Sequence, residues 1–563
     1  MSTLPHPRDL RSLALVVPFF VAPIFALASC AAPADRTARY DVVEATIPEM
    51  QQALQEGRVT SRELVEAHLV RIALYEEVVN ATLAVNPRVL QIADSLDRER
   101  AEGRVRGPLH GIPVALKDNI HTTDMPTTGG ALAFEGFTPP YAATLTRNLE
   151  ESGAIILAKT VLTEWANFMA AGMPTNYSAL GGYGRNPYDP RRDPREGRND
   201  GRPVMSTGGS SSGIGTAMSF WAANVGTETS GSILSPANQT MLVGIKPTVG
   251  RVSRYGVIPI TADQDIAGPM ARTVTDAAIM LGALESTEPD PNDPATATCE
   301  RPPEGDYTRF LRTDGLRGAR IGIPRAMYYD SVQVPGSSQW RGGLSAEARA
   351  MMDTVIAVLQ DQGAVIVDPA DIPSILDPDS ANNLLLSGRS IVLDYGMKRD
   401  FNLWLASLGE SAPMKSLTEL REWNLAHRAA GSMKYEQARL DGSDALDLER
   451  HRARYEADRA RDLRLSGEQG IDAVMTALQL DALLFPGTSS AGIAARPGYP
   501  TVIVPFGFVP NTAGPEFPEG FDPRPQPYGV SFTGGACSEP RLLELAYAFE
   551  QATKRRVPPT GVR

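Results

Sequence analysis

The sequence predicts a layered α/β fold, and two observations lead to that prediction. The chain has 563 residues, of which 42% are hydrophobic, and this is enough for a large buried core. From residue 107 onward, short β-like runs alternate with helical stretches, as in proteins whose helices pack against a sheet. Length alone allows three or four domains of about 150 residues each.

The first 29 residues have the layout of a signal peptide. Two arginines precede an apolar run over residues 13–27, which two prolines interrupt and which ends at Leu-Ala-Ser-Cys30. The run is shorter than the about 20 residues that a membrane-spanning helix needs. Leu-Ala-Ser-Cys resembles the lipobox of bacterial lipoproteins, which implies cleavage before Cys30 and acylation of its thiol. We therefore expect a signal peptide over 1–29 and a linker over 30–46.

Export is expected from this N-terminus in either of two forms. The first is a protein of the bacterial cell envelope or periplasm, anchored in the membrane by a lipid on Cys30. The alternative is an ordinary secretory signal cut near Ala32. Cys299 and Cys537 would then lie in an oxidising compartment and could pair. One lies in a Pro/Asp-rich loop and the other in a Gly-rich turn, and this separation leads us to expect free thiols.

Helical periodicity covers residues 47–104, where apolar positions recur every three or four residues. Thr60 and Glu63 have the spacing of a capping box, which predicts the start of a helix at that point. His68 falls on this helix, and we expect it to be a structural residue rather than a ligand.

The rest of the chain follows the α/β pattern. Residues 306–470 are mainly amphipathic and helical, and the loops 189–203 and 285–305 are rich in Pro, Gly and Asp. Asp290, Asn292 and Asp293 do not have the spacing of a calcium loop. We expect strands over 112–116, 154–157, 222–225, 257–260, 320–323, 481–486 and 501–505, and helices over 276–284 and from 540 to about 556.

Charge composition narrows the function class. The chain has 54 Lys and Arg against 66 Asp and Glu, a net charge of −12, and no basic cluster, which argues against a nucleic-acid partner. Only seven of the 54 basic residues are Lys, and Lys117 directly follows the apolar run 112–116. Burial there would lower its pKa and supply a neutral amine as a base. The plainer alternative is an exposed Lys117 that pairs with Asp118.

A serine-hydrolase motif is present at residues 209–213, Gly-Ser-Ser-Ser-Gly, with Ser211 at its centre. In α/β-hydrolases this motif follows a buried strand and is served by a downstream His. The lead-in here is not strand-like, and the two later histidines, His427 and His451, lie in charged helical surroundings. We therefore reject a Ser-His-Asp triad and expect both histidines at the surface.

Four ordered segments together resemble the amidase signature family. They are Gly-Ile-Pro-Val-Ala-Leu-Lys-Asp-Asn at 111–119, the Gly/Ser-rich core from 207 to 237, Gly-Ile-Lys-Pro-Thr-Val-Gly at 244–250, and Asp-Ile-Ala-Gly-Pro-Met-Ala-Arg-Thr-Val at 265–274. A family-like segment also follows residue 498. The likeness covers about residues 45–285 and 475–555, and it is closest to peptide amidases through Thr-Glu-Trp-Ala-Asn-Phe and Gly-Thr-Glu-Thr.

This resemblance implies one large domain. Because matching motifs lie on both sides of residues 306–470, they must share one core, built on a central mixed β-sheet covered by helices on both faces. We expect the amidase domain over 47–555, with core motifs at 107–285 and 475–555, a variable substrate-pocket region at 306–470, and a tail at 556–563.

The resemblance also implies residue roles. Ser232 would be the nucleophile, Ser210 the bridging serine on a cis Gly209–Ser210 peptide, and Lys117 the base. The backbone amides of Thr229, Ser230, Gly231 and Ser232 would form the oxyanion hole, and neither a metal nor an organic cofactor is needed. The 22 positions from Ser210 to Ser232 are two fewer than is usual in the family, so we expect a shortened helix between them. Ser230 and Leu234 also depart from the residues common in relatives.

The sequence therefore predicts an exported serine amidase that hydrolyses a small acyl or aryl amide, or a peptide C-terminal amide, through an acyl-Ser232 intermediate. The variable region would complete the pocket, with Trp404 and Trp423 expected to be packing residues. Two alternatives stay open: an ammonia-releasing enzyme like the amidase component of glutamyl-tRNA amidotransferase, and an inactive envelope lipoprotein with this fold. A homodimer is compatible with all three.

Overall fold

The computed structural model describes residues 40–512 and 514–560. The expected signal peptide and the expected lipidation site Cys30 lie outside these residues and stay predictions. Among the described helices, none combines the length and the apolar character needed to cross a membrane.

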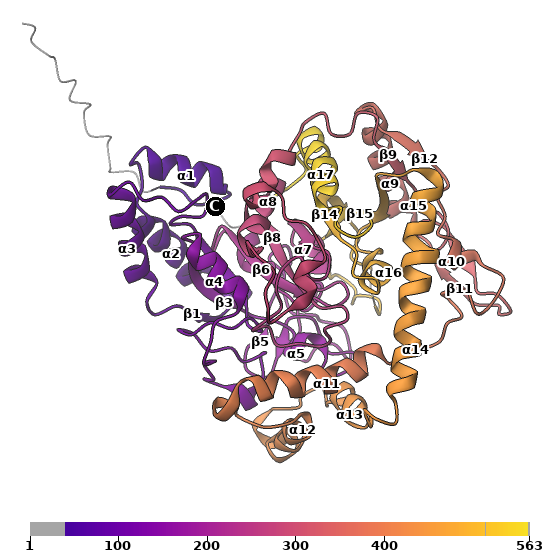
Figure 1. Cartoon of the computed structure of the whole chain (residues 1–563), viewed down its shortest axis with the longest axis horizontal. Coiled ribbons are helices and arrows are strands. Elements are labelled where there is room, and N and C mark those ends of the chain that lie inside the picture. The colour runs from indigo at the N-terminus through magenta and orange to yellow at the C-terminus, as the bar shows by residue number, and fades with distance from the viewer. Residues whose placement is uncertain (1–39, 513, 561–563) are drawn as a thin grey trace, which may run out of the picture. The chain divides into compact units, whose positions relative to one another are not determined.

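An 11-stranded mixed sheet forms the centre of the molecule (Figure 1). Strands β3, β2 and β6 are parallel neighbours, whereas β6–β8, β8–β7, β7–β14, β14–β15 and β15–β13 are antiparallel. In spatial order the strands are β1 (Thr82–Val85), β3 (Ile155–Thr160), β2 (Pro113–Lys117), β6 (Ala223–Glu228), β8 (Ile266–Ala271), β7 (Val243–Lys246), β14 (Thr501–Val509), β15 (Gln526–Thr533), β13 (Ala482–Pro486), β9 (Arg320–Gly322) and β12 (Val365–Val367).

Helices cover both faces of this sheet, as expected. Every residue of β2, β3, β6 and β8 is buried, and successive side chains of a strand point to opposite faces. The helices are α1 (Ile47–Gln55), α2 (Ser61–Val79), α3 (Val89–Ala101), α4 (Thr144–Glu151), α5 (Glu164–Asn167), α6 (Ile214–Ala217), α7 (Leu234–Gln239), α8 (Val274–Leu284), α9 (Ala346–Asp361), α10 (Pro373–Leu376), α11 (Val392–Ser407), α12 (Leu417–Ala426), α13 (Ala438–Asp444), α14 (Arg452–Leu463), α15 (Asp472–Leu478), α16 (Ala491–Ala495) and α17 (Glu539–Thr553).

The α/β alternation predicted from sequence is confirmed, although one expected strand is absent and β7, β8, β12 and β15 were not among the expected strands. The expected strand 257–260 is wrong, because Val257 makes only an isolated bridge to Ile120 and residues 258–260 are irregular. The helical region 47–104 contains the edge strand β1, which the periodicity did not reveal. The capping box of Thr60 and Glu63 does start α2.

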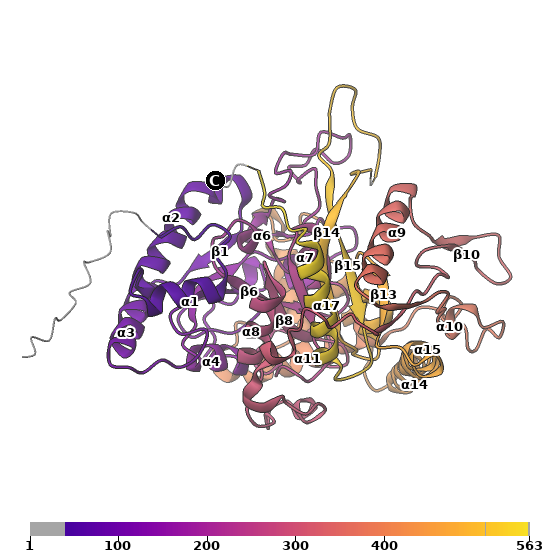
Figure 2. The same ribbon diagram turned by 90° about the horizontal axis from the view of Figure 1, so that it is seen from above.

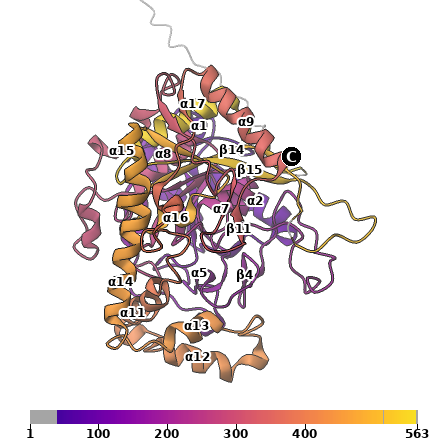
Figure 3. The ribbon, with the colours of Figure 1, turned by 90° about the vertical axis from the view of Figure 1, so that its right-hand side faces the viewer.

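The variable region 306–470 is mostly helical and lies along two sides of the sheet core. Figure 1 shows α11, α12 and α13 along the lower edge, with α14 leading from them toward α15, and Figure 3 shows the same helices from the side. A small hairpin, β10 (Ser331–Gln333) and β11 (Trp340–Gly342), also belongs to this region. In Figure 2 the long connection between β14 and β15 extends beyond the rest of the sheet.

The two cysteines of the described chain form a disulfide, so the expectation of free thiols is wrong. Cys299 and Cys537 are joined with a Cα–Cα distance of 5.5 Å although 238 positions separate them. The Cys537 amide donates to Thr248 Oγ1, which ties the turn that contains Cys537 to the loop that follows β7. Tertiary packing brings together two loops that are unrelated in sequence.

Candidate active site

Parallel pairing of β2 and β6 places Lys117 at the site. Leu116 pairs with Val225, so the carboxyl ends of both strands lie at one edge of the sheet, where parallel strands commonly present functional side chains. The side chain of Lys117 therefore reaches Thr227, and its Nζ lies 2.8 Å from Thr227 Oγ1 and 3.3 Å from Thr227 O.

Lys117 Nζ also lies 2.8 Å from Ser210 Oγ, and both residues are completely buried. Burial lowers the pKa of Lys117 to about 7, while the Asp265 and Glu228 carboxylates oppose this shift. The alternative of an exposed lysine paired with Asp118 is wrong. A neutral amine at Lys117 can accept a proton near neutral pH.

Two glycines bring the Ser210 segment against the Ser232 segment. A Cβ on Gly209 would lie 2.6 Å from Ser232 Cα, and one on Gly208 would lie 2.4 Å from the carbonyl carbon of Ser235. The Ser211 amide donates to Ser232 O at 3.3 Å. Only residues without a side chain fit between these two segments, which places Ser210 next to Ser232.

The expected cis Gly209–Ser210 peptide is wrong. In the described part of the chain the cis peptide bond is Asp368–Pro369. Gly208 has a φ of 92°, a left-handed conformation that glycine adopts readily, and it turns the chain before Ser210. Ser210 thus reaches Lys117 without the cis bond.

A short helix lies between the two serines, and its shortening relative to the family stays a prediction. Helix α6 has only four residues, Ile214–Ala217. Trp221 packs against Gly215, where a Cβ would lie 2.0 Å from the indole, and the chain then enters β6.

Residues 229–232 follow β6 and carry free backbone amides. Within residues 40–512 and 514–560, none of these four amides donates a hydrogen bond. Gly231 has a φ of 91°, which turns the segment so that Ser230 is exposed and Ser232 half-buried, unlike the buried Ser210. An oxyanion placed beside this segment would meet unpaired donors.

Two carboxylates that sequence reasoning missed hold this segment in place. Glu228 Oε2 accepts from the amides of Ile233 and Leu234 at 2.7 and 3.0 Å, which fixes the chain directly after Ser232. Asp265 Oδ1 accepts from Thr229 Oγ1 at 2.5 Å. Acidic residues within segments of otherwise small or apolar residues were the feature of the sequence that could have identified Glu228 and Asp265 as positioning residues.

A cavity of about 640 Å³ adjoins the free amides through Ser230. It lies between the sheet edge and the variable region, and a cavity of this size can hold a small organic ligand. Its lining residues are Phe168, Ala171, Ser230, Gln264, Gly388, Arg389, Ser390, Val392, Leu393, Asp394, Ala438, Arg439, Gly442, Asp462, Gly492 and Arg496.

The other residues considered from sequence have structural roles. Trp404 is buried and donates to His121 Nε2 at 2.9 Å, and Trp423 stacks on His427 with ring centroids 3.8 Å apart, as expected for packing residues. Ser211 Oγ donates to Thr227 O at 2.9 Å. His68 is buried in contact with Ser219 O, and His427 and His451 are at the surface.

The oxygen-bearing residues of loop 285–305 are engaged by the protein itself. Asp290 accepts from the Thr144 and Ser253 hydroxyls, and Asp293 forms an ion pair with Arg254. These contacts explain the conformation of the loop without a bound ion.

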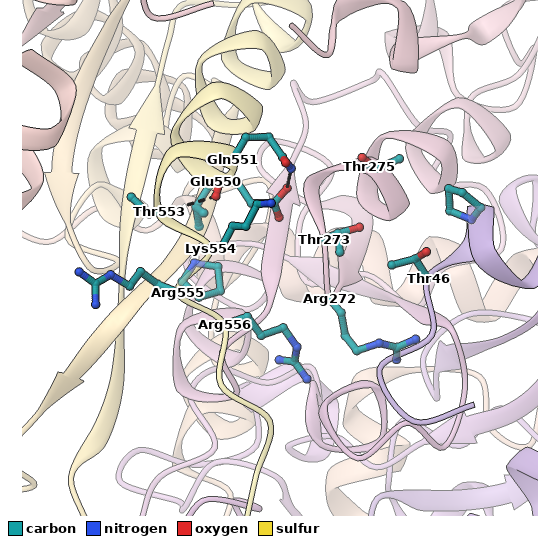
Figure 4. A pocket seen from close by; sticks show the side chains of 13 residues that line it. Thr46, Arg272, Thr273, Thr275, Glu550, Gln551, Thr553, Lys554, Arg555 and Arg556 are labelled. Atoms are coloured by element: carbon teal, nitrogen blue, oxygen red, sulfur yellow. Dashed lines mark hydrogen bonds between the residues drawn. The ribbon is translucent and has the colours of Figure 1, made fainter. Parts of the chain in front are cut away.

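A second cavity, of about 380 Å³, lies between the end of α17 and the starts of α1 and α8 (Figure 4). Two of its charged groups, Arg272 and Glu550, are used for internal contacts. Arg272 donates to the carbonyls of Thr216, Trp221 and Ala45, and Glu550 Oε1 accepts from the Val274 amide. None of the predicted site residues lines this cavity, so it is separate from the serines.

Comparisons with known proteins agree on one family. A family model described as Amidase matches residues 63–543. A probable amidase of Arabidopsis thaliana is 36% identical over 529 residues, which cover 92% of each chain. The X-ray structure of native peptide amidase from Stenotrophomonas maltophilia is similar with a TM-score of 0.78 at 37% identity, covering 92% of this chain and 98% of that one. A glutamyl-tRNA(Gln) amidotransferase component of Rhodopirellula baltica is 32% identical over 536 residues, covering 91% of this chain and 97% of that one.

Proposed function

The chain belongs to the amidase family and is a hydrolase of carbon–nitrogen bonds in amides, and we propose that it works through an acyl-Ser232 intermediate. The observation that carries this proposal is the contact of the buried Lys117 amine with Ser210 Oγ at 2.8 Å. A serine hydroxyl is a weak nucleophile until a base takes its proton. Lys117, deprotonated near neutral pH, can serve as that base through Ser210.

The reaction would proceed in two halves. Ser210 takes the proton from Ser232 while it passes its own to Lys117, and Ser232 Oγ attacks the amide carbon. The amides of residues 229–232 stabilise the tetrahedral oxyanion, each donor contributing about 3 kcal/mol. Lys117 and Ser210 return the proton to the leaving amine, which departs. A water then loses its proton along the same path and hydrolyses the acyl-Ser232 ester.

We propose a C-terminally amidated peptide or a small acyl or aryl amide as the substrate. The likeness to a peptide amidase across 92% of this chain supports this choice, and the cavity beside Ser230 has room for one or two residues. The likeness to an amidotransferase component makes glutamine-dependent ammonia release a second candidate. Turnover of peptide amides by the isolated chain would favour amide hydrolysis over glutamine-dependent ammonia release.

The decisive experiment compares the wild type with Ser232→Ala on a panel of peptide amides, nitroanilides and simple acyl amides. We expect Ser232→Ala to lower kcat by roughly 10⁴-fold or more, while Ser380→Ala, at an exposed position, leaves it unchanged. Mass spectrometry of the acid-quenched wild type should find the acyl group on the Ser232 peptide. Equal turnover by Ser232→Ala would refute the mechanism.

We also propose that the protein is exported and anchored through a lipid on Cys30. The Cys299–Cys537 disulfide supports export, because disulfides persist in oxidising compartments. Metabolic labelling with a fatty-acid analogue tests the anchor against a Cys30→Ser control. A mature wild-type protein without label would remove Cys30 from this proposal.

A further inference from the structure

The cavity beside Ser230 has a cationic lining in a chain that is acidic as a whole. Three arginines face two aspartates there, although the net charge of the whole chain is −12. A local excess of one charge in a cleft attracts ligands of the opposite charge. The charged lining residues are Arg389, Asp394, Arg439, Asp462 and Arg496.

The three arginines differ in how their charge is compensated. Arg389 is paired with Asp394 at 2.6 Å, and Arg496 lies 3.5 Å from Asp462. Arg439 forms no ion pair with any residue of the described chain. The excess positive charge of the cavity therefore belongs to Arg439.

Arg439 is held in place by its backbone and by an aromatic ring. Its amide donates to Met169 O at 3.3 Å, which ties the start of α13 to the segment after α5. Its guanidinium carbon lies 5.6 Å from the centre of the Phe168 ring, within the range of a cation–π contact. Phe168 lines the same cavity. A guanidinium held on an aromatic face keeps its N–H groups free for an anion.

We propose that the acyl part of the substrate carries a carboxylate, which pairs with Arg439, so that the enzyme prefers acidic amides. The proposal rests on the hydrolase function proposed above and names its substrate class. A guanidinium binds a carboxylate through two parallel hydrogen bonds. Because the cavity is open to solvent, the expected preference is about tenfold rather than larger.

The experiment uses three amides that differ in the charge of one side chain: the α-amides of N-acetylglutamate, N-acetylmethionine and N-acetyllysine. Ammonia release gives kcat/KM for the wild type, Arg439→Gln, Arg439→Glu and Arg428→Gln. The last is a matched control, since Arg428 lies in the same region, pairs with Glu436 at the surface and is not a lining residue of the cavity. Calorimetry with the Ser232→Ala variant measures the affinity for each of the same amides in the absence of turnover.

The wild type and Arg428→Gln should favour the glutamate amide about tenfold over the methionine amide, mainly through KM, and disfavour the lysine amide. Arg439→Gln should abolish the preference, and Arg439→Glu should reverse it. Equal binding of all three amides to Ser232→Ala, or an unchanged preference in Arg439→Gln, would overturn the inference. Absence of turnover in the wild type would refute peptide amides as the substrate proposed above, while the order of binding would still decide the charge preference.

Discussion

Two buried lysines on neighbouring strands show how surroundings assign a role. Lys117 ends β2 and Lys159 lies in β3, where it pairs with Leu116 in the strand register. Both side chains are fully buried. Lys159 contacts the Asp118 carboxylate at 3.2 Å, whereas the hydrogen-bond partners of Lys117 are two hydroxyls and a carbonyl.

This difference decides which amine can act as a base. Burial lowers the pKa of Lys159 as well, but the neighbouring Asp118 carboxylate opposes this shift. Lys117 has carboxylates only at longer range, and its pKa falls to about 7. The same residue type at the same depth is therefore structural in one place and suited to proton transfer in the other.

Replacement of Lys117 by Met should have the largest effect on activity. A positioned general base contributes about 10²–10⁴-fold, so kcat/KM of Lys117→Met should fall by that factor while its circular dichroism spectrum stays that of the wild type. Lys159→Met is the matched control. Its kcat/KM, calculated per folded molecule, should stay close to that of the wild type. Comparable losses in both variants would erase the functional distinction between the two lysines.

The free energy of unfolding should be affected more by Lys159→Met than by Lys117→Met, the opposite of the order expected for activity. Lys159→Met leaves the Asp118 carboxylate buried without its cation, and breaking a buried pair costs about 3–5 kcal/mol. Denaturant unfolding should reveal this loss, and Asp118→Asn in the Lys159→Met background should restore part of it. Lys117→Met removes a buried amine without orphaning a carboxylate, so its free energy of unfolding should not fall.

The smallest expected effect is on pH dependence. The base must be neutral, so kcat/KM should fall as the pH drops below a midpoint near 7, the pKa of Lys117. Because this value lies below the ordinary 10.5, the unfolded chain binds more protons between pH 7 and 10.5, and Lys117 makes stability rise with pH across that window. Lys117→Met should lack this rise in stability with pH. Asp265→Asn removes a carboxylate that raises the pKa of Lys117, so the midpoint of its pH–rate profile should be lower than that of the wild type. An unchanged midpoint would contradict this effect of Asp265.

Local patterns were sufficient to predict much of the fold. The short β-like runs at 112–116 and 222–225 located β2 and β6, and the Thr60–Glu63 spacing located the start of α2. The apolar residues 257–260 looked equally strand-like, but they are irregular, and the amide of Ile258 donates to Asn119 O in the turn that follows β2. That outcome depends on a distant segment and has no local signature.

The candidate site divides in the same way. Motif resemblance singled out Lys117, Ser210 and Ser232, and the structure brings Lys117 Nζ to 2.8 Å from Ser210 Oγ. Whether Asp118 would pair with Lys117 or with a lysine elsewhere depended on the pairing of β2 with β3. The link between residues 299 and 537 depended on packing around Thr248. Contacts between distant segments decided both, and a single sequence does not reveal them.

The disulfide has a consequence for cleavage of the chain by proteases. It closes a covalent ring that contains all of β10, β11 and the helices from α9 to α16. The hairpin of β10 and β11 is exposed, with Trp340 at 64%, and exposed hairpins are preferred sites of nicking. A single cut there leaves both fragments in one molecule until the disulfide is reduced.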